Sequence, residues 1–239
     1  SGGSGNVNSY VSGAVLDQQG IIRHGSDLFK RYNLTAKMNI KILPWLTLGY
    51  TNRWTREEYS RPSYMTGLFF HNIARRWPTN PVRDPNGHYV AGNEIIQMEG
   101  SGIDRTQKDY SAQQITLEAR PIAGLMLRAE NNYNITSANN HWDVRAIYSH
   151  DKKGDPVLTS REGGDAGRTS VHEDAYKTNY FNGRYYAEYR HLFADKHDVK
   201  VVAGLDLEIN KYRDLGGTKL DLITNDVATV NTATNDKPS

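Results

Sequence analysis

Apolar and polar residues alternate along the stretch from residue 31 to residue 42. Even positions carry Tyr, Leu, Ala, Met and Ile, whereas odd positions carry Arg, Asn, Thr and Lys. A period of two is typical of a β-strand that has one apolar and one polar face. Even positions from 46 to 54 are again mostly apolar, and Pro44 between the two runs favours a tight reversal. We therefore predict a β-hairpin with these facing pairs: Ile42 with Leu46, Met38 with Tyr50, and Leu34 with Trp54.

The same alternation returns at 6–18, 110–121, 125–135, 179–193 and 199–211. Short turns near Pro44, Ala123 and Asp195 join neighbouring segments. The pattern predicts an antiparallel meander of about seven long strands. One face should carry the even positions of 32–42 and the odd positions of 115–119, 125–129 and 199–209, because a slip of one residue would turn every apolar side chain to the other face.

Stretches without this periodicity follow the hairpins, over about 56–109, 137–178 and 213–239. A short helix is predicted within 63–77, closed by Pro78. All short turns then lie at one end of the sheet and all long loops at the other. This asymmetry, with strands of about 11–15 residues against a usual 5–6, is typical of outer-membrane barrels. The predicted fold class is all-β: an antiparallel meander of long strands, part of a transmembrane outer-membrane β-barrel, with long extracellular loops.

A barrel assigns the apolar face to lipid and the polar face to a hydrated lumen. Aromatic residues near strand ends fit the girdles at the membrane interfaces, although aromatic residues also favour strands in general. The girdle candidates are Trp45 and Phe193 at the turn end, and Trp54, Tyr133 and Tyr180 toward the loop end. The expected ion pairs of the lumen face are Arg31 with Glu57, Glu118 with Arg128, and Arg184 with Asp206 or Glu208.

Composition excludes several classes of protein. The net charge is +2, and the basic residues are scattered along the chain without the basic stripe that nucleic-acid binding requires. No apolar run reaches the ~18 residues of a membrane helix, which excludes helical membrane proteins only. The eight His are isolated, and no catalytic or nucleotide-binding motif occurs. The sequence DKKGD at 151–155 lacks the carboxylate series of a calcium loop. We therefore predict no enzyme activity, no cofactor and no metal site.

The loops are the candidate functional region. Unstructured loops longer than about 12–15 residues usually bind something or are disordered. The residues singled out for contact with a substrate or partner are Phe69, Phe70, Trp77, Tyr89 and Trp142. The competing interpretation is that Phe69 and Phe70 only pack the loop onto the barrel rim.

Four segments carry a family resemblance: SGGSGNVNSYVSGAVLDQQGII, KRYNLTAKMNIKILPWLTLGY, RRWPTNPVRDPNGHYV and KHDVKVVAGLDLE. Their order and spacing resemble the barrel of SusC/RagA-type TonB-dependent outer-membrane transporters. The resemblance implies an outer-membrane barrel with an N-terminal plug, energised by the TonB complex. It further implies import of glycans or peptides with a SusD-like surface lipoprotein as lid. Signal peptide, TonB box, plug and closing strands are expected outside residues 1–239, because about seven strands cannot close even the ~8-stranded minimum barrel.

Two functional hypotheses from different classes remain. The first is a barrel segment of such an importer, in contact with membrane lipid. The second is a soluble secreted β-sheet module that binds carbohydrate on Trp77, Tyr89 or Trp142. A passive porin is a third. Dependence on detergent separates the first two, because an open lipid-facing sheet aggregates in water.

Overall fold

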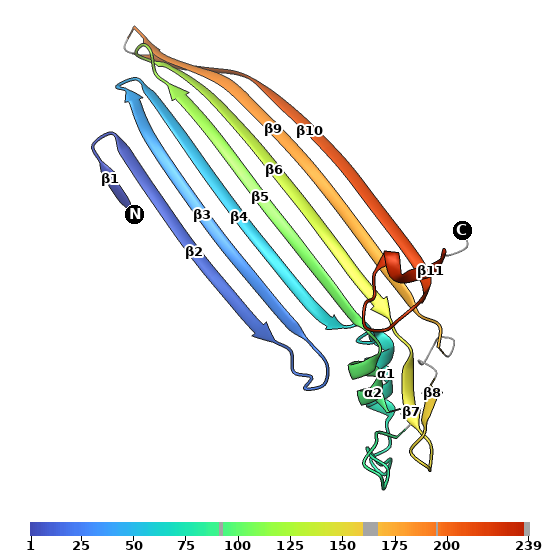
Figure 1. Cartoon of the computed structure of the whole chain (residues 1–239). Coiled ribbons are helices and arrows are strands. Elements are labelled where there is room, and N and C mark those ends of the chain that lie inside the picture. Colours follow the sequence, from blue (N-terminus) through green and yellow to red (C-terminus); the bar gives the residue numbers. More distant parts are fainter. Residues whose placement is uncertain (91–92, 160–166, 195, 237–239) are drawn as a thin grey trace.

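The computed structural model describes residues 1–90, 93–159, 167–194 and 196–236. Nine strands of these residues form one large antiparallel sheet in chain order, except that a separate two-stranded hairpin is inserted between its sixth and seventh strands (Figure 1). Its strands are β1 (Gly2–Ser4), β2 (Val7–Gln19), β3 (Leu28–Leu43), β4 (Leu46–Pro62), β5 (Ile103–Ala119), β6 (Leu125–Val144), β9 (Ser170–Phe193), β10 (His197–Leu222) and β11 (Ala233–Asp236). The predicted meander of long strands is confirmed, and the short β1 and β11 flank it.

The register confirms the predicted faces. Met38 lies opposite Tyr50, Tyr50 opposite Ile115, and the same row ends at Leu207 on β10. Facing residues share a side of the sheet, so the even positions of β3 and the odd positions of β5, β6 and β10 lie together. Leu34 faces Trp54 as expected. The pair of Ile42 with Leu46 was wrong, because a bulge between residues 41 and 43 places Leu43 opposite Leu46.

Several strands run further than the alternation predicts. β4 continues to Pro62, β5 begins at Ile103, and β10 continues to Leu222. The loops predicted over about 56–109, 137–178 and 213–239 are therefore shorter, at 63–102, 145–169 and 223–232. In the extensions polar residues occupy positions on both faces, with only scattered apolar residues such as Leu215, so backbone pairing persists while the period-two signal is lost.

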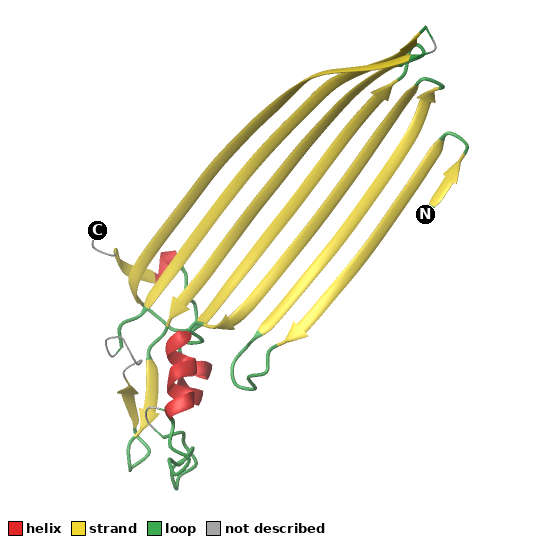
Figure 2. Cartoon of the chain, turned by 180° about the vertical axis from the view of Figure 1, so that it is seen from behind, coloured by secondary structure: helices red, strands yellow, loops and turns green. Residues whose placement is uncertain are grey.

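The apolar face of the sheet is open. Leu34, Met38, Val201, Leu205 and Ile209 are 45%, 37%, 57%, 57% and 51% exposed, respectively. Among the described residues, no helix or second sheet lies over this face (Figure 2). The buried hydrophobic cluster lies instead beyond the loop end, where Tyr64, Phe69 and Met98 pack together. No helix in the described part of the chain is long and apolar enough to span a membrane.

The polar face carries cross-strand ion pairs, as predicted for two of the three sites. Glu118 and Arg128 lie 3.6 Å apart, and Arg184 and Asp206 lie 3.3 Å apart. The third expectation was wrong. Glu57 lies between Arg31 and Lys108 in the register, and within the described ranges no ion pair joins it to either cation.

One girdle residue was assigned to the wrong face. Tyr180 faces Asn134 and Asn210 on the polar side of the sheet, because it is an even position of β9. Trp54 and Tyr133 lie on the apolar face toward the loop end, as predicted.

Candidate functional site

In the described part of the chain, the tight turns of the long strands lie at one end of the sheet, and a folded group of loops lies at the other (Figure 1). We call this group, the described residues of 20–27, 63–102 and 145–169, the loop unit. It contains α1 (Gly67–Arg75), α2 (Glu94–Gly100) and the hairpin of β7 (Ile147–His150) and β8 (Pro156–Thr159). η1 (Val230–Thr232) follows β10.

Asp143 fixes the base of the loop unit. Its carboxylate is fully buried, accepts a hydrogen bond from the backbone N–H of Ile103 at 3.1 Å, and forms an ion pair with Arg145. Ser101 accepts a backbone hydrogen bond from Arg145 at 2.9 Å, which ties the end of α2 to the chain leaving β6. A buried charge held by several donors orders its surroundings. These contacts therefore hold the ends of the loops in place where they leave the sheet.

Helix α1 forms over part of the segment in which the sequence predicted a helix, and it is anchored by aromatic packing. Phe69 is 4% exposed and meets the ring of Tyr64 edge-on, with ring centres 6.0 Å apart. Asn72 donates a hydrogen bond to the Tyr64 hydroxyl at 3.1 Å. Met98 of α2 completes the cluster, so the two helices pack through one small apolar core.

Helix α2 begins at a side-chain cap. The Asn93 side chain accepts a hydrogen bond from the Ile95 backbone N–H at 2.8 Å, which satisfies one of the free donors of the first turn. Glu94, in the first turn, forms a bidentate ion pair with Arg76, the residue that follows α1. The distance from Arg76 Nε to Glu94 Oε2 is 3.0 Å. The ion pair and the apolar core together fix the spacing between α1 and α2.

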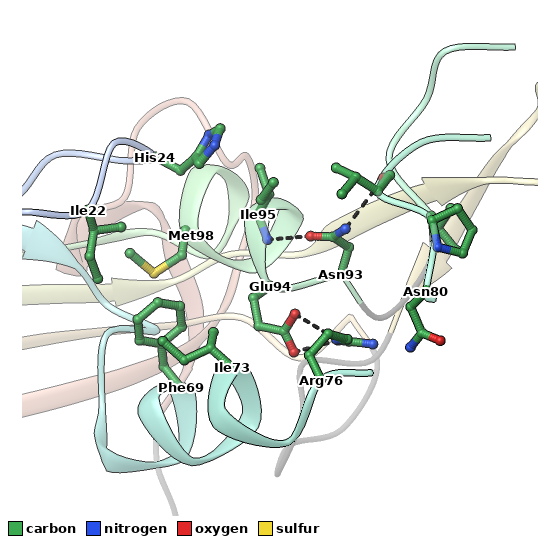
Figure 3. A pocket seen from close by; sticks show the side chains of 13 residues that line it. Ile22, His24, Phe69, Ile73, Arg76, Asn80, Asn93, Glu94, Ile95 and Met98 are labelled. Atoms are coloured by element: carbon green, nitrogen blue, oxygen red, sulfur yellow. Dashed lines mark hydrogen bonds and ion pairs between the residues drawn. The ribbon is translucent and has the colours of Figure 1, made fainter. Parts of the chain in front are cut away.

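A cavity of about 570 Å³ lies between these elements (Figure 3). This volume is within the usual ~300–1,000 Å³ of small-ligand sites. Its apolar walls include Ile22, Phe69, Ile73, Val82, Ile95 and Met98. Its polar lining residues are His24, Asn80, Asn93 and the ion pair of Arg76 with Glu94. The cavity can take an apolar group while offering amide, carboxylate and guanidinium partners at its edge.

The loop of residues 20–27 forms one wall of the cavity. His24 Nδ1 lies 2.8 Å from Glu99 Oε1, which ties this loop to α2. Gly25 adopts a φ of +79°, and a Cβ there would lie 2.5 Å from Pro62 Cγ and 2.9 Å from the Met98 carbonyl oxygen. Only glycine fits this approach without displacement of the loop.

The structure separates the predicted contact residues. Of the five, only Phe69 lines the cavity, and it does so from the buried core. Phe70 and Trp77 are 47% and 73% exposed. The guanidinium of Arg83 lies over the ring of Tyr89, 4.1 Å from the ring centre, in a cation–π contact. Trp142 stacks on His172 of the neighbouring strand, with ring centres 3.4 Å apart.

Sequence reasoning missed α2, which supplies Glu94, Ile95 and Met98 to the cavity. The signal was present in GNEIIQMEG, where an Asn cap precedes an acidic first residue. Nothing in the sequence indicated that Ile22 and His24 line this cavity, because their loop is about 40 residues or more away in sequence from α1 and α2. Among the described residues no group of three or more His, Asp or Glu is placed to hold a metal ion. DKKGD forms a turn in which Asp151 accepts backbone hydrogen bonds from Lys153 and Asp155.

Comparison with known proteins identifies the fold. No protein-family model matches the sequence, and no curated protein matches it. Solved structures do match, over 98% of this chain: the RagAB peptide importer in the open-open state (TM-score 0.71, 16% identity), the RagAB peptide transporter (0.74, 17%), and the RagAB peptide importer in the closed-closed state (0.73, 18%). The chain spans 26% of each of those chains. The chain therefore has the fold of a segment of a barrel-type outer-membrane transporter, as the resemblance to SusC/RagA-type transporters implies.

Proposed function

We propose that this chain forms barrel wall and outer loops of an active importer in the outer membrane. In this proposal the TonB complex energises uptake through a plug domain, and a SusD-like surface lipoprotein closes over the loop unit. The structural likeness to the RagAB peptide importer supports the proposal. So does the position of the loop unit, which gathers the folded loops at one end of the sheet (Figure 1).

The loop unit favours peptides over glycans as the cargo. Protein sites bind sugars by stacking them on open aromatic faces. One face of Tyr89 is covered by Arg83 and one of Trp142 by His172, which leaves the exposed Trp77 outside the cavity as the open platform among the three candidates. The cavity instead presents an apolar lining beside an amide and an ion pair. This combination suits an amino-acid side chain and its backbone amides. The cavity is the observation that carries the proposal.

A secreted carbohydrate-binding module remains the alternative. That function needs a covered sheet, because a soluble protein rarely exposes a large contiguous apolar patch. The open apolar face of β3 and β10 argues against it. Purification discriminates the two: the importer requires detergent, whereas a module stays monomeric without it.

A cavity-filling substitution tests the proposal in the complete transporter. Ile73 of α1 lines the cavity and is 45% exposed, so Ile73→Trp should block the cavity without touching the Arg76–Glu94 pair. Leu68→Trp, on the same helix but outside the cavity lining, is the matched control. We expect Ile73→Trp to lower uptake of a labelled peptide mixture at least tenfold, equivalent to about 1.4 kcal/mol. Equal uptake by the two variants would exclude the cavity as a peptide site.

Deletion of residues 64–90 tests the role of the whole loop. The barrel should still insert, because the sheet does not depend on this segment for its pairing. Growth on the imported nutrient, or capture of the surface lipoprotein, should be lost. Wild-type uptake together with unchanged lipoprotein association would show that the loop is only a cover.

A further inference from the structure

Three cations lie together on the apolar side of the sheet, just beyond its apolar residues. Lys177 of β9 faces Arg213 of β10, and Lys211 is the next residue of β10 on the same side. Ile209 and Phe181 are the last apolar residues below them on these strands. All three cations are exposed. They therefore lie one and two outward-facing positions beyond the apolar band, at the loop end.

These cations lack the partners that similar cations have elsewhere on this side. Arg56 lies 2.8 Å from Asp109, and Lys30 lies 3.3 Å from Asp17. In the described ranges, no ion pair is found for the three cations.

The carboxylates nearest in the register on this side are already engaged. Asp109, two strands away from Lys177, is held by Arg56, and Glu173 contacts His141 at 2.5 Å. Asp214 and Asp174 point to the polar side of the sheet, because they are even positions of β10 and β9. Like charges directly opposite each other destabilise a sheet. A counter-charge from outside the chain would remove that cost.

We propose that Lys177, Lys211 and Arg213 bind the phosphate groups of lipid headgroups in the outer leaflet. The cations border the apolar face, so a lipid whose chains pack on Phe181 and Ile209 carries its headgroup to their level. Long basic side chains also bend toward this boundary while their stems stay in the apolar layer. A free phosphate ion would supply the charge but would make no use of the adjoining apolar surface. The inference rests on the membrane placement of the sheet and not on the identity of the cargo.

The test uses the complete transporter in neutral detergent micelles, titrated with diphosphoryl lipid A, with bound lipid counted by native mass spectrometry. Each basic residue near an anionic lipid surface contributes about fivefold in affinity. We expect the double variant Lys177→Gln/Lys211→Gln to bind the lipid roughly 25-fold more weakly than wild type. The control Lys37→Gln/Lys41→Gln removes the same charge from the polar face and should bind like wild type. The variant Lys177→Arg/Lys211→Arg should retain binding.

Three outcomes would overturn the inference. They are equal lipid binding by both double variants, equal binding of dephosphorylated lipid A, and displacement of the lipid by inorganic phosphate at equal concentration. For each variant, a difference in gel mobility between the unheated and the heat-unfolded sample, equal to that of wild type, confirms that the barrel is folded. If the wild-type protein does not insert into vesicles at all, the membrane placement fails, and the proposed function fails with it. Insertion and peptide uptake without any lipid preference would refute the lipid site alone.

Discussion

Replacement of Met38 by Arg tests whether the apolar face of the sheet meets lipid. Met38 lies opposite Tyr50, the midpoint of the apolar run at even positions 46–54 of β4. Its side chain is therefore near the middle of the apolar band. An Arg at the midplane of a membrane barrel costs about 2–4 kcal/mol, and this falls to about 0–1 kcal/mol near the interfaces. We expect Met38→Arg to lower the free energy of unfolding of the complete barrel by about 2–4 kcal/mol.

Two other residues of β3 supply matched controls. Leu34 lies on the same face four residues nearer the loop end, about 13 Å away along the strand at ~3.3 Å per residue. Leu34→Arg should therefore cost only about 1 kcal/mol. Lys37 points to the polar face, and Lys37→Met should change the unfolding free energy by less than about 0.5 kcal/mol.

The assay is a guanidinium titration of the complete protein folded into phosphatidylcholine vesicles, followed by tryptophan fluorescence. Comparable losses for Met38→Arg and Lys37→Met would refute the assignment of the lipid face. A loss at Leu34 as large as that at Met38 would refute the assigned depth. Met38→Asn provides a milder version of the same comparison in case Met38→Arg fails to insert.

Further predictions concern the loop unit. Gly25→Ala should displace the loop of residues 20–27 and speed amide hydrogen exchange in α2, whereas Gly87→Ala, at a site with open space around its Cβ, should leave α2 unchanged. Glu94→Ala should lower the local stability of α2 by about 1–3 kcal/mol, less than the 3–5 kcal/mol of a fully buried pair, because the Arg76 side chain is 38% exposed; unchanged exchange rates in α2 would contradict this. Backbone N–H donors of Asp155 and Lys153 hold the pKa of Asp151 below its usual value. The stabilisation of the β7–β8 turn is therefore present above about pH 4 and lost as the pH falls through the lowered pKa, so amide protection at Lys153 should fall in acid in the wild type but not in Asp151→Asn.

The sequence predicts the sheet best where one face of a strand is apolar and the other is polar. Between residues 32 and 42 apolar and polar side chains alternate strictly, so polarity reports the face of the sheet directly. Beyond Trp54 polar residues occupy both faces of the strand, and Arg56 and Glu57 no longer differ in polarity. Backbone pairing continues there without a side-chain signal, which is why β4 runs on to Pro62. The Ile42 bulge was invisible for a different reason, because the side-chain pattern does not record an extra residue at a turn.

The candidate site was only partly predictable. The sequence indicated the right region, since Phe69 and the helix around it form one wall of the cavity. It did not indicate that Tyr89 and Trp142 are engaged by Arg83 and His172, because these contacts depend on the final fold. The residues that lie together in the cavity come from separate connections, and no local pattern links Ile22 to Met98.

In the proposed membrane placement, the register of the sheet also fixes how far its strands lean from the membrane normal. The apolar run of β3, 32–42, is centred on Lys37, which lies in the same register row as Glu208 of β10. The run of β10, 199–209, is centred on residue 204, four residues closer to the short turns. Four residues are about 13 Å at ~3.3 Å each, and the five steps between β3 and β10 are about 24 Å at ~4.8 Å each, which corresponds to a lean of about 30°. Two residues in one register row therefore differ in their depth in the proposed membrane. Lys211 and Leu34 share a row, but this placement puts Lys211 at the level of the headgroups and Leu34 within the hydrocarbon.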